Sequence, residues 1–159
     1  MRVQDFPLAW RWTDPNHTFL PADKLAQIVP LSPTEAHVLH KEWMPVFDRY
    51  GNVVTTNFAT IEKVSTEGEW QEDACSRTKH STEPITNWLK EKEKTDKLDV
   101  FISWDERLAV RTNWELFVQQ WSDFCYPSSD DAFVVPIQKQ WLLAFHHEDE
   151  FSFCWSAKK

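Results

Sequence analysis

Two aromatic-rich runs near the C-terminus constrain the fold of this chain more than any other stretch. The sequence WLLAFHHEDEFSFCWS covers residues 141–156 and sets five ionisable residues between the two runs. Side chains alternate between the two faces of a β-strand, so each run can bury one row of apolar side chains. The stretch therefore predicts a β-hairpin whose strands are buried and whose tip is in water.

The aromatic rows also predict the register of this hairpin. Pairing Phe145 with Phe153 and Leu143 with Trp155 keeps the large side chains of both runs on one face, whereas a loop with an even number of residues would distribute them over both faces. The loop with an odd number of residues displays its carboxylates to solvent. Its three residues are expected to be Glu148, Asp149 and Glu150.

The histidines beside this loop are the alternative candidates for a chemical site. Adjacent strand residues point to opposite faces, so His146 and His147 should not bind one metal ion unless the strand ends before His146. A zinc site needs three or four converging ligands. His37 and His40 share a predicted helix, where a hydrogen-bonded histidine at the edge of the core is the simpler interpretation. We therefore expect no metal and no cofactor.

The rest of the chain mixes predicted helices with predicted hairpins. Ser32 with Glu35, and Thr112 with Glu115, match the capping-box pattern that starts a helix. Further helices are expected at residues 23–29 and 81–94, and further strands at residues 8–12, 52–64, 100–104, 108–112 and 132–137. The 100–112 hairpin should have a loop at residues 105–107. Because of Pro136, the 132–137 strand is expected at an edge or a bulge.

This order of elements favours the α+β class. We expect a largely antiparallel sheet of hairpins with three or four helices packed on one face. The chain has 159 residues, which is long enough for one core, so residues 1–159 are expected to form a single globular domain.

Composition excludes several classes of function. The chain has 10 tryptophans but only 2 glycines; glycine averages about 7% of residues, and two glycines cannot form a P-loop or a GxGxxG turn. The three cysteines contain no CxxC pair, which favours reduced, buried thiols. No apolar run is long enough to span a membrane, and the N-terminus lacks the apolar segment of a secretory signal. We expect a cytoplasmic protein.

The charge of the chain suggests the kind of partner it binds. A formal net charge of -8 opposes binding to nucleic acid and favours a basic protein. Exposed acidic side chains would steer such a partner, and exposed tryptophans are common among interface hot spots. Trp10 and Trp12 are hard to place in the core and are further candidates. The predicted partner-binding residues are Glu148, Asp149, Glu150, Asp130, Asp131 and Trp70.

The segment KQWLLAFHHEDEFSFCWS, which follows a predicted strand and has an acidic hairpin tip, resembles the C-terminal hairpin of several small, acidic, Trp-rich bacterial proteins. Some of those proteins act as immunity proteins beside secreted toxins. The resemblance covers the last 30 residues, and elsewhere only size and composition. It implies a stoichiometric inhibitor that covers the active site of a toxin, often a basic nuclease cleft.

These observations together predict a non-enzymatic protein-binding domain. Its most concrete form is an immunity protein that neutralises a cognate bacterial toxin. We expect this protein to bind neither a membrane nor nucleic acid. One alternative is a small metal-dependent or acid/base hydrolase that uses His146, His147 and neighbouring carboxylates. A structural adaptor in a larger assembly is the other alternative.

Overall fold

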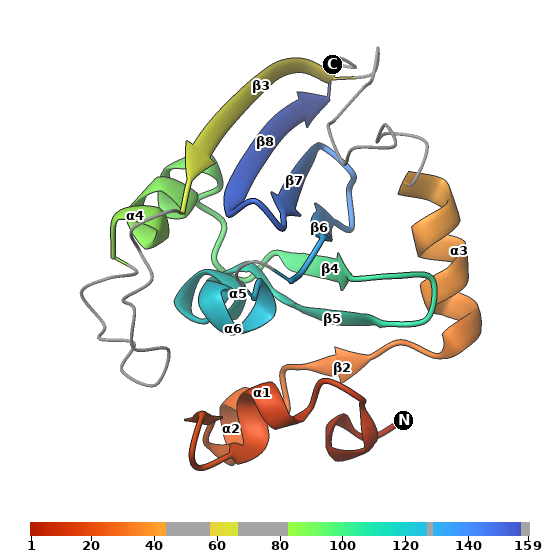
Figure 1. Cartoon of the computed structure of the whole chain (residues 1–159). Helices are drawn as coiled ribbons and strands as arrows, with labels where there is room; N and C mark the ends of the chain where they lie inside the picture. Colours follow the sequence, from red (N-terminus) through yellow and green to blue (C-terminus); the bar gives the residue numbers. More distant parts are fainter. Residues whose placement is uncertain (44–57, 67–82, 127–128, 157–159) are drawn as a thin grey trace.

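The structure, a computed structural model, describes residues 1–43, 58–66, 83–126 and 129–156. The strands of its sheet are β2 (Val29–Pro30), β3 (Phe58–Ser65), β4 (Asp99–Ser103), β5 (Ala109–Asn113), β6 (Ala132–Pro136), β7 (Trp141–His146) and β8 (Glu150–Ser156). Within the described residues these seven strands form one sheet with the order β2-β5-β4-β6-β7-β8-β3 (Figure 1). Each neighbouring pair is antiparallel, so the predicted antiparallel sheet is confirmed.

Helices cover both faces of this sheet. They are the 3-10 helix η1 (Val3–Asp5) and the α-helices α1 (Trp10–Thr13), α2 (Ala22–Leu25), α3 (Pro33–Trp43), α4 (Glu83–Lys92), α5 (Trp114–Gln119) and α6 (Trp121–Phe124). The α+β class is confirmed. Helices α1, α4, α5 and α6 supply side chains to the larger core on one face, as expected, whereas α3 lies against the other face (Figure 1).

The central strands explain why both faces are covered. Every residue of β6 is buried, and alternate β6 residues enter different cores. Val134 belongs to the larger core, while Phe133 and Val135 pack with Ala36 and Leu39 of α3. An antiparallel strand with one wet face would alternate apolar and polar residues. The unbroken apolar runs of β6 and β7 are the sequence signal of a second covering helix.

The start of α3 follows the predicted capping box. The backbone N–H of Ser32 donates to the Glu35 carboxylate at 2.8 Å, and the N–H of Glu35 donates to Ser32 Oγ at 3.3 Å. These hydrogen bonds lower the pKa of Glu35. The sequence also predicts a kink of this helix at Pro45 and its end at Gly51, and both positions lie outside the described residues.

The hairpin between β4 and β5 has the predicted register. Ile102 pairs with Val110, and both side chains enter the larger core. The N–H of Trp104 donates to the carbonyl of Leu108 at 2.9 Å, so residues 105–107 form the expected odd-numbered loop. The number of loop residues follows from the apolar pattern alone, because only a loop with an odd number of residues puts both apolar rows on one face.

Three other expectations about secondary structure were wrong. Residues 8–12 do not form a strand: Trp12 lies in α1 and is fully buried. The strand with Pro136 is not at an edge, because β6 pairs with both β4 and β7, and Pro136 is accommodated as its last residue. The helix expected at residues 23–29 ends earlier, and Val29 begins β2.

The amphipathic helix expected after Thr112 is two short helices. α5 ends before Gln120, whose φ of -121° and ψ of 22° are not helical, and α6 follows. Helical spacing predicts six inward side chains, and all six are buried: Trp114, Phe117, Val118, Trp121, Phe124 and Cys125. Leu116 and Asp123 are buried as well, which the spacing does not predict.

Asn113, not Thr112, caps α5. Its Oδ1 accepts from the N–H of Leu116 at 2.9 Å, whereas Thr112 is a β5 residue whose buried hydroxyl has no hydrogen-bond partner among the described residues. We expect Asn113→Ala to lower the free energy of unfolding by about 1 kcal/mol, because it removes an N-cap. Thr112→Val, which removes no hydrogen bond, should leave it unchanged or slightly higher. Urea unfolding of both variants measures the difference, and a larger loss in Thr112→Val would contradict this assignment.

The C-terminal hairpin is present, but its register is two residues away from the predicted one. Phe145 pairs with Phe151, and His146 pairs with Glu150. The three-residue loop is therefore 147–149, and Glu150 belongs to β8. A shift of two residues leaves every side chain on its predicted face, since strand side chains repeat with a period of two. Asp149 has a φ of 60°, a left-handed conformation that Asp tolerates better than most residues.

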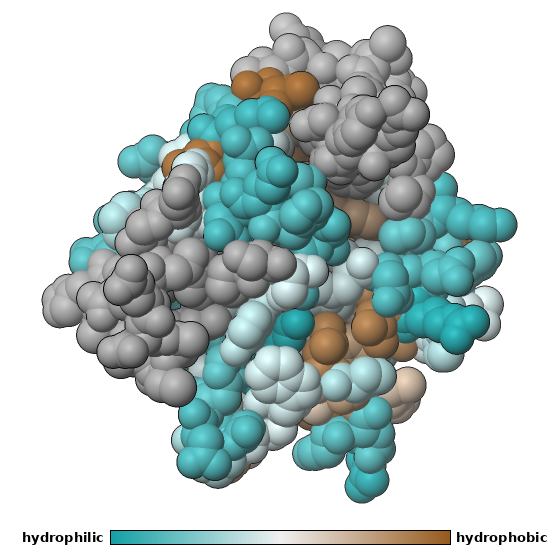
Figure 2. Space-filling model, viewed as in Figure 1, coloured by the Kyte–Doolittle hydropathy of each residue, from teal (hydrophilic) through white to brown (hydrophobic). Residues whose placement is uncertain are grey.

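The surface is mixed in character. Figure 2 shows a mostly hydrophilic face on which apolar residues gather in the region of β2. In the described part of the chain, no helix has both the length and the apolar character needed to cross a membrane.

Candidate functional site

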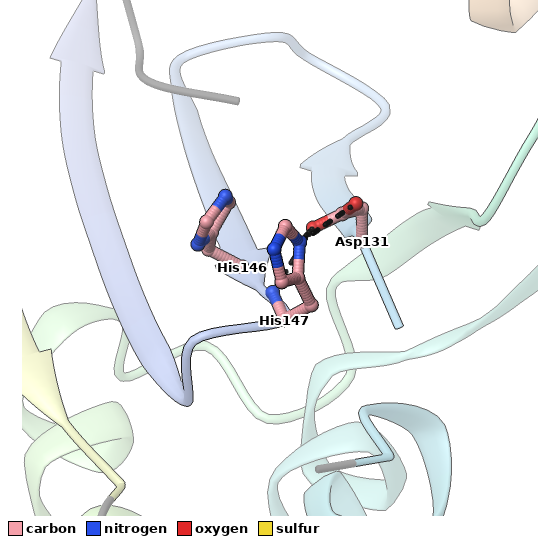
Figure 3. Close-up of side chains that lie close together, drawn as sticks. All are labelled: Asp131, His146 and His147. Carbon is pink, nitrogen blue, oxygen red and sulfur yellow. Dashed lines mark hydrogen bonds and ion pairs between the residues drawn. The ribbon is translucent and has the colours of Figure 1, made fainter. Parts of the chain in front are cut away.

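The candidate site lies at the end of the sheet where the β7–β8 turn meets the start of β6. The pairing of Ala132 with Phe145 brings the residue before β6, Asp131, next to the end of β7. Asp131, His146 and His147, here called the His–Asp cluster, then lie together (Figure 3). One possible ligand atom from each residue lies within 4.8 Å of the other two.

The two histidines do not point apart as strand alternation predicted. Their ring centroids are 4.1 Å apart. Alternation fails here because β7 ends at His146, and His147 is the first residue of the turn. The predicted loop of residues 148–150 puts the end of the strand after His147. The convergence of both rings near one carboxylate is thus a correction of the prediction.

Hydrogen bonds hold the cluster in place. Asp131 Oδ1 accepts from the backbone N–H of His147 at 3.0 Å and lies 3.0 Å from Nδ1 of the same residue. The backbone N–H of Glu148 donates to His146 Nδ1 at 3.3 Å, and a Glu148 carboxylate oxygen lies 3.9 Å from that nitrogen. Each imidazole is therefore beside one carboxylate.

The predicted partner-binding residues separate into two groups. The side chains of Asp131 and Glu148 are 62% and 79% exposed. Asp149, which comes directly after Glu148 in the sequence, is partly exposed. Glu150 lies in β8, where it pairs with Lys63 at 3.2 Å. The remaining two residues do not join this surface: Asp130 is turned inward, and Trp70 lies outside the described residues.

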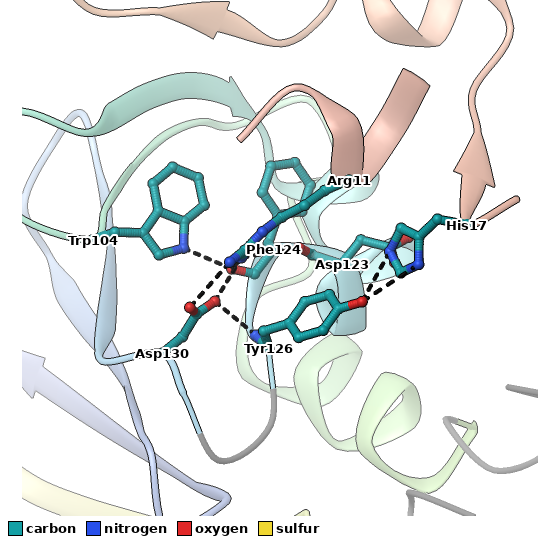
Figure 4. Close-up of polar contacts among 7 residues, drawn as sticks. All are labelled: Arg11, His17, Trp104, Asp123, Phe124, Tyr126 and Asp130. Atoms are coloured by element: carbon teal, nitrogen blue, oxygen red, sulfur yellow. Dashed lines mark hydrogen bonds and ion pairs between the residues drawn. The ribbon is translucent and has the colours of Figure 1, made fainter. Parts of the chain in front are cut away.

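Asp130 forms a buried ion pair with Arg11 (Figure 4). The guanidinium donates from both terminal nitrogens to the carboxylate, at 2.6 and 3.1 Å, and the two side chains are only 6% and 11% exposed. The backbone N–H of Tyr126 donates to the same carboxylate at 2.8 Å. Trp10, Trp104 and Tyr126 surround the guanidinium with ring centroids 4.9 to 5.9 Å away. This pair fixes the backbone immediately before Asp131.

A second polar group adjoins this ion pair and was not predicted. His17 Nε2 lies 3.2 Å from the buried carboxylate of Asp123, and the hydroxyl of Tyr126 lies 3.4 Å from the same ring. Figure 4 shows His17 beside Asp123 and Tyr126. The partly exposed Trp10 ring contacts both His17 and Tyr126. No spacing in the sequence relates these residues. An arginine inside the apolar run LAWRW was the single available signal of a buried charge.

The other titratable candidates are not brought together. His37 pairs with Glu106 at the surface, while His40 stacks on Phe133, and burial lowers the pKa of His40. Desolvation also raises the pKa of the Cys125 thiol, and that of Cys154 to about 11. Both thiols are free and buried, as predicted. A thiol with a raised pKa is a poor nucleophile, so neither cysteine is a candidate for catalysis.

The comparison with protein families identifies one match. A family model described as "Protein of unknown function (DUF2947)" matches residues 1–153. No curated protein and no solved structure matches the chain significantly. Since the family model covers nearly the whole sequence, including every strand of the sheet up to β8, the chain belongs to the DUF2947 family.

Proposed function

We propose that the chain is a non-enzymatic protein-binding domain that contacts a basic partner through the exposed carboxylates around the β7–β8 turn. The observation that carries the proposal is the exposure of Asp131 and Glu148, with Asp149, at one end of the sheet. The net charge of -8 supports the same sign of partner. Here these three residues are called the acidic turn.

The arrangement suits recognition because the charges are displayed on a rigid base. β7 is buried up to its last residue, and Phe145 and Phe151 pack at a centroid distance of 4.9 Å just behind the turn. Asp131 is fixed by the ion pair of its neighbour Asp130. Rigid display lowers the entropy lost on binding, and exposed charges accelerate association with an oppositely charged surface.

The most concrete form of the proposal is an immunity protein. The support is the resemblance of the C-terminal hairpin to such proteins, together with an acidic end that matches a basic nuclease cleft in charge. This form implies a cytoplasmic location and a toxin as the partner. A structural adaptor differs from it only in the identity of the partner.

Charge reversal of the acidic turn tests the proposal. The tagged chain and the triple variant Asp131→Lys, Glu148→Lys, Asp149→Lys are used to capture partners from a lysate of the native host, followed by mass spectrometry. We expect a basic protein that the wild type retains and the triple variant loses. With that protein purified, the variant should bind about tenfold more weakly or worse, mainly through slower association, and with a smaller salt dependence.

A matched control changes the net charge equally at other sites. The control variant Asp23→Lys, Glu91→Lys, Asp99→Lys reverses three exposed carboxylates on α2, α4 and β4, and it should bind like the wild type. Equal losses in both variants would show a general charge effect and would remove the acidic turn from the interface. For the immunity form, expression of the captured partner should stop growth unless the wild-type chain is present.

A further inference from the structure

We propose that the His–Asp cluster is a binding site for a divalent transition-metal ion, with Zn²⁺ as the ion that fits its donors best. His146 and His147 would each supply an imidazole nitrogen, and Asp131 a carboxylate oxygen. This inference does not depend on the proposed partner, because it concerns the isolated chain.

The donor set is the first argument. Two imidazoles and one carboxylate are a common set of protein ligands at zinc sites that keep one position open, and the same set suits other divalent transition metals. Calcium and magnesium prefer oxygen ligands alone. Two histidines beside one carboxylate therefore select for the transition metals.

The geometry is the second argument. Bonds of 2.0–2.2 Å to a tetrahedral ion place its ligand atoms about 3.4 Å apart. The possible ligand atoms of Asp131, His146 and His147 already lie within 4.8 Å of one another, so closing around an ion requires a movement of little more than 1 Å between them. Figure 3 shows the two imidazole rings side by side with the carboxylate next to His147. All three side chains are at least partly exposed, which leaves an entry path for the ion.

The supporting contacts are the third argument. The backbone N–H of His147 orients the Asp131 carboxylate, and the buried Arg11–Asp130 pair holds the adjoining backbone. Glu148 lies 3.9 Å from His146 Nδ1, where it would serve as an outer carboxylate or as a fourth ligand. Carboxylates beside ligating histidines raise their basicity and fix their orientation. The cluster is thus assembled before any ion arrives.

Isothermal titration calorimetry of Zn²⁺ into the full chain, first stripped with a chelator, tests this site. We expect one equivalent of ion to bind. His146→Ala, His147→Ala and Asp131→Ala should each weaken binding about tenfold or more, since loss of even an outer-sphere partner of a metal ligand costs 10- to 100-fold. Replacing Zn²⁺ by Co²⁺ gives an optical readout of the same site, because a tetrahedral Co²⁺ complex absorbs visible light.

The matched control is His37→Ala. His37 is also an exposed histidine beside a carboxylate, Glu106 at 3.5 Å, but it belongs to no group of three converging possible ligands among the described residues. This variant should bind Zn²⁺ like the wild type. Binding that does not saturate at one equivalent, or that survives unchanged in both His146→Ala and His147→Ala, would overturn the site. Because the titration contains no partner protein, its failure would leave the partner-binding proposal untouched.

Discussion

Replacing Arg11 by methionine is expected to lower the free energy of unfolding by about 3–5 kcal/mol. The substitution leaves the carboxylate of Asp130 buried without its guanidinium partner, and an uncompensated buried charge has a cost of this size. The substitution also removes the contacts of the guanidinium with the rings of Tyr126 and Trp104. Urea unfolding followed by tryptophan fluorescence measures the change.

Two further variants make this expectation specific. Arg11→Met combined with Asp130→Asn removes both charges and should recover part of the loss, since a neutral pair needs no counter-ion. Arg2→Met also breaks an arginine–aspartate ion pair, the one with Asp5, but the Arg2 side chain is 80% exposed. Exposed pairs contribute little, so this variant should unfold like the wild type. A loss in Arg11→Met no larger than that in Arg2→Met would refute the structural role of the buried pair.

The second large effect is expected for Trp114→Ala, at about 3–5 kcal/mol of lost stability, the usual range for truncating a buried aromatic residue. Trp114 is 1% exposed and contacts Phe117 and Trp141 at centroid distances of 5.4 and 5.0 Å. Its indole N–H donates to the carbonyl of Glu93 at 2.8 Å, which ties α5 to the end of α4. Thermal and urea unfolding both report this loss.

Two further variants separate the contribution of packing at Trp114 from that of its hydrogen bond. Trp114→Phe keeps most of the buried ring but leaves the Glu93 carbonyl without this donor, so we expect a loss of about 1–3 kcal/mol. Phe19→Ala truncates a ring that is 68% exposed and should have no measurable effect. If Phe19→Ala were as damaging as Trp114→Ala, the assignment of Trp114 to the centre of the core would be wrong.

The proposed surface and the proposed metal site share one end of the sheet, and this end shows how far sequence reasoning reaches. The alternation of aromatic residues correctly predicted that one row of side chains from β7 and β8 enters the larger core, but it did not predict that Leu142 packs into a second core on the other face. It did not predict the register, because a slip of two residues preserves every face. The slip moved Glu150 out of the loop and His147 into it, and this change alone lets the two imidazoles converge.

Contacts with distant segments decide that register. On its outer side β8 pairs with β3, where Ser65 lies opposite Glu150 and Lys63 forms an ion pair with the Glu150 carboxylate. The N–H of Thr66 donates to the carbonyl of Asp149 at 2.6 Å. These partners are more than 80 residues away along the chain, so no local pattern in residues 141–156 can contain them.

Local rules were sufficient wherever the relevant atoms lie within a few residues of one another. The capping box of Ser32 and Glu35 and the odd-numbered loop at 105–107 follow from short-range hydrogen bonding and parity. The α+β class follows from the order of such elements. In contrast, the side of the sheet that α3 covers, the burial of Arg11 and the exposure of Asp131 beside a buried Asp130 depend on packing between segments far apart in sequence. Long-range packing can reverse the preference of a single residue for water or for the core, and for that reason it alone set the chemistry at the end of the sheet.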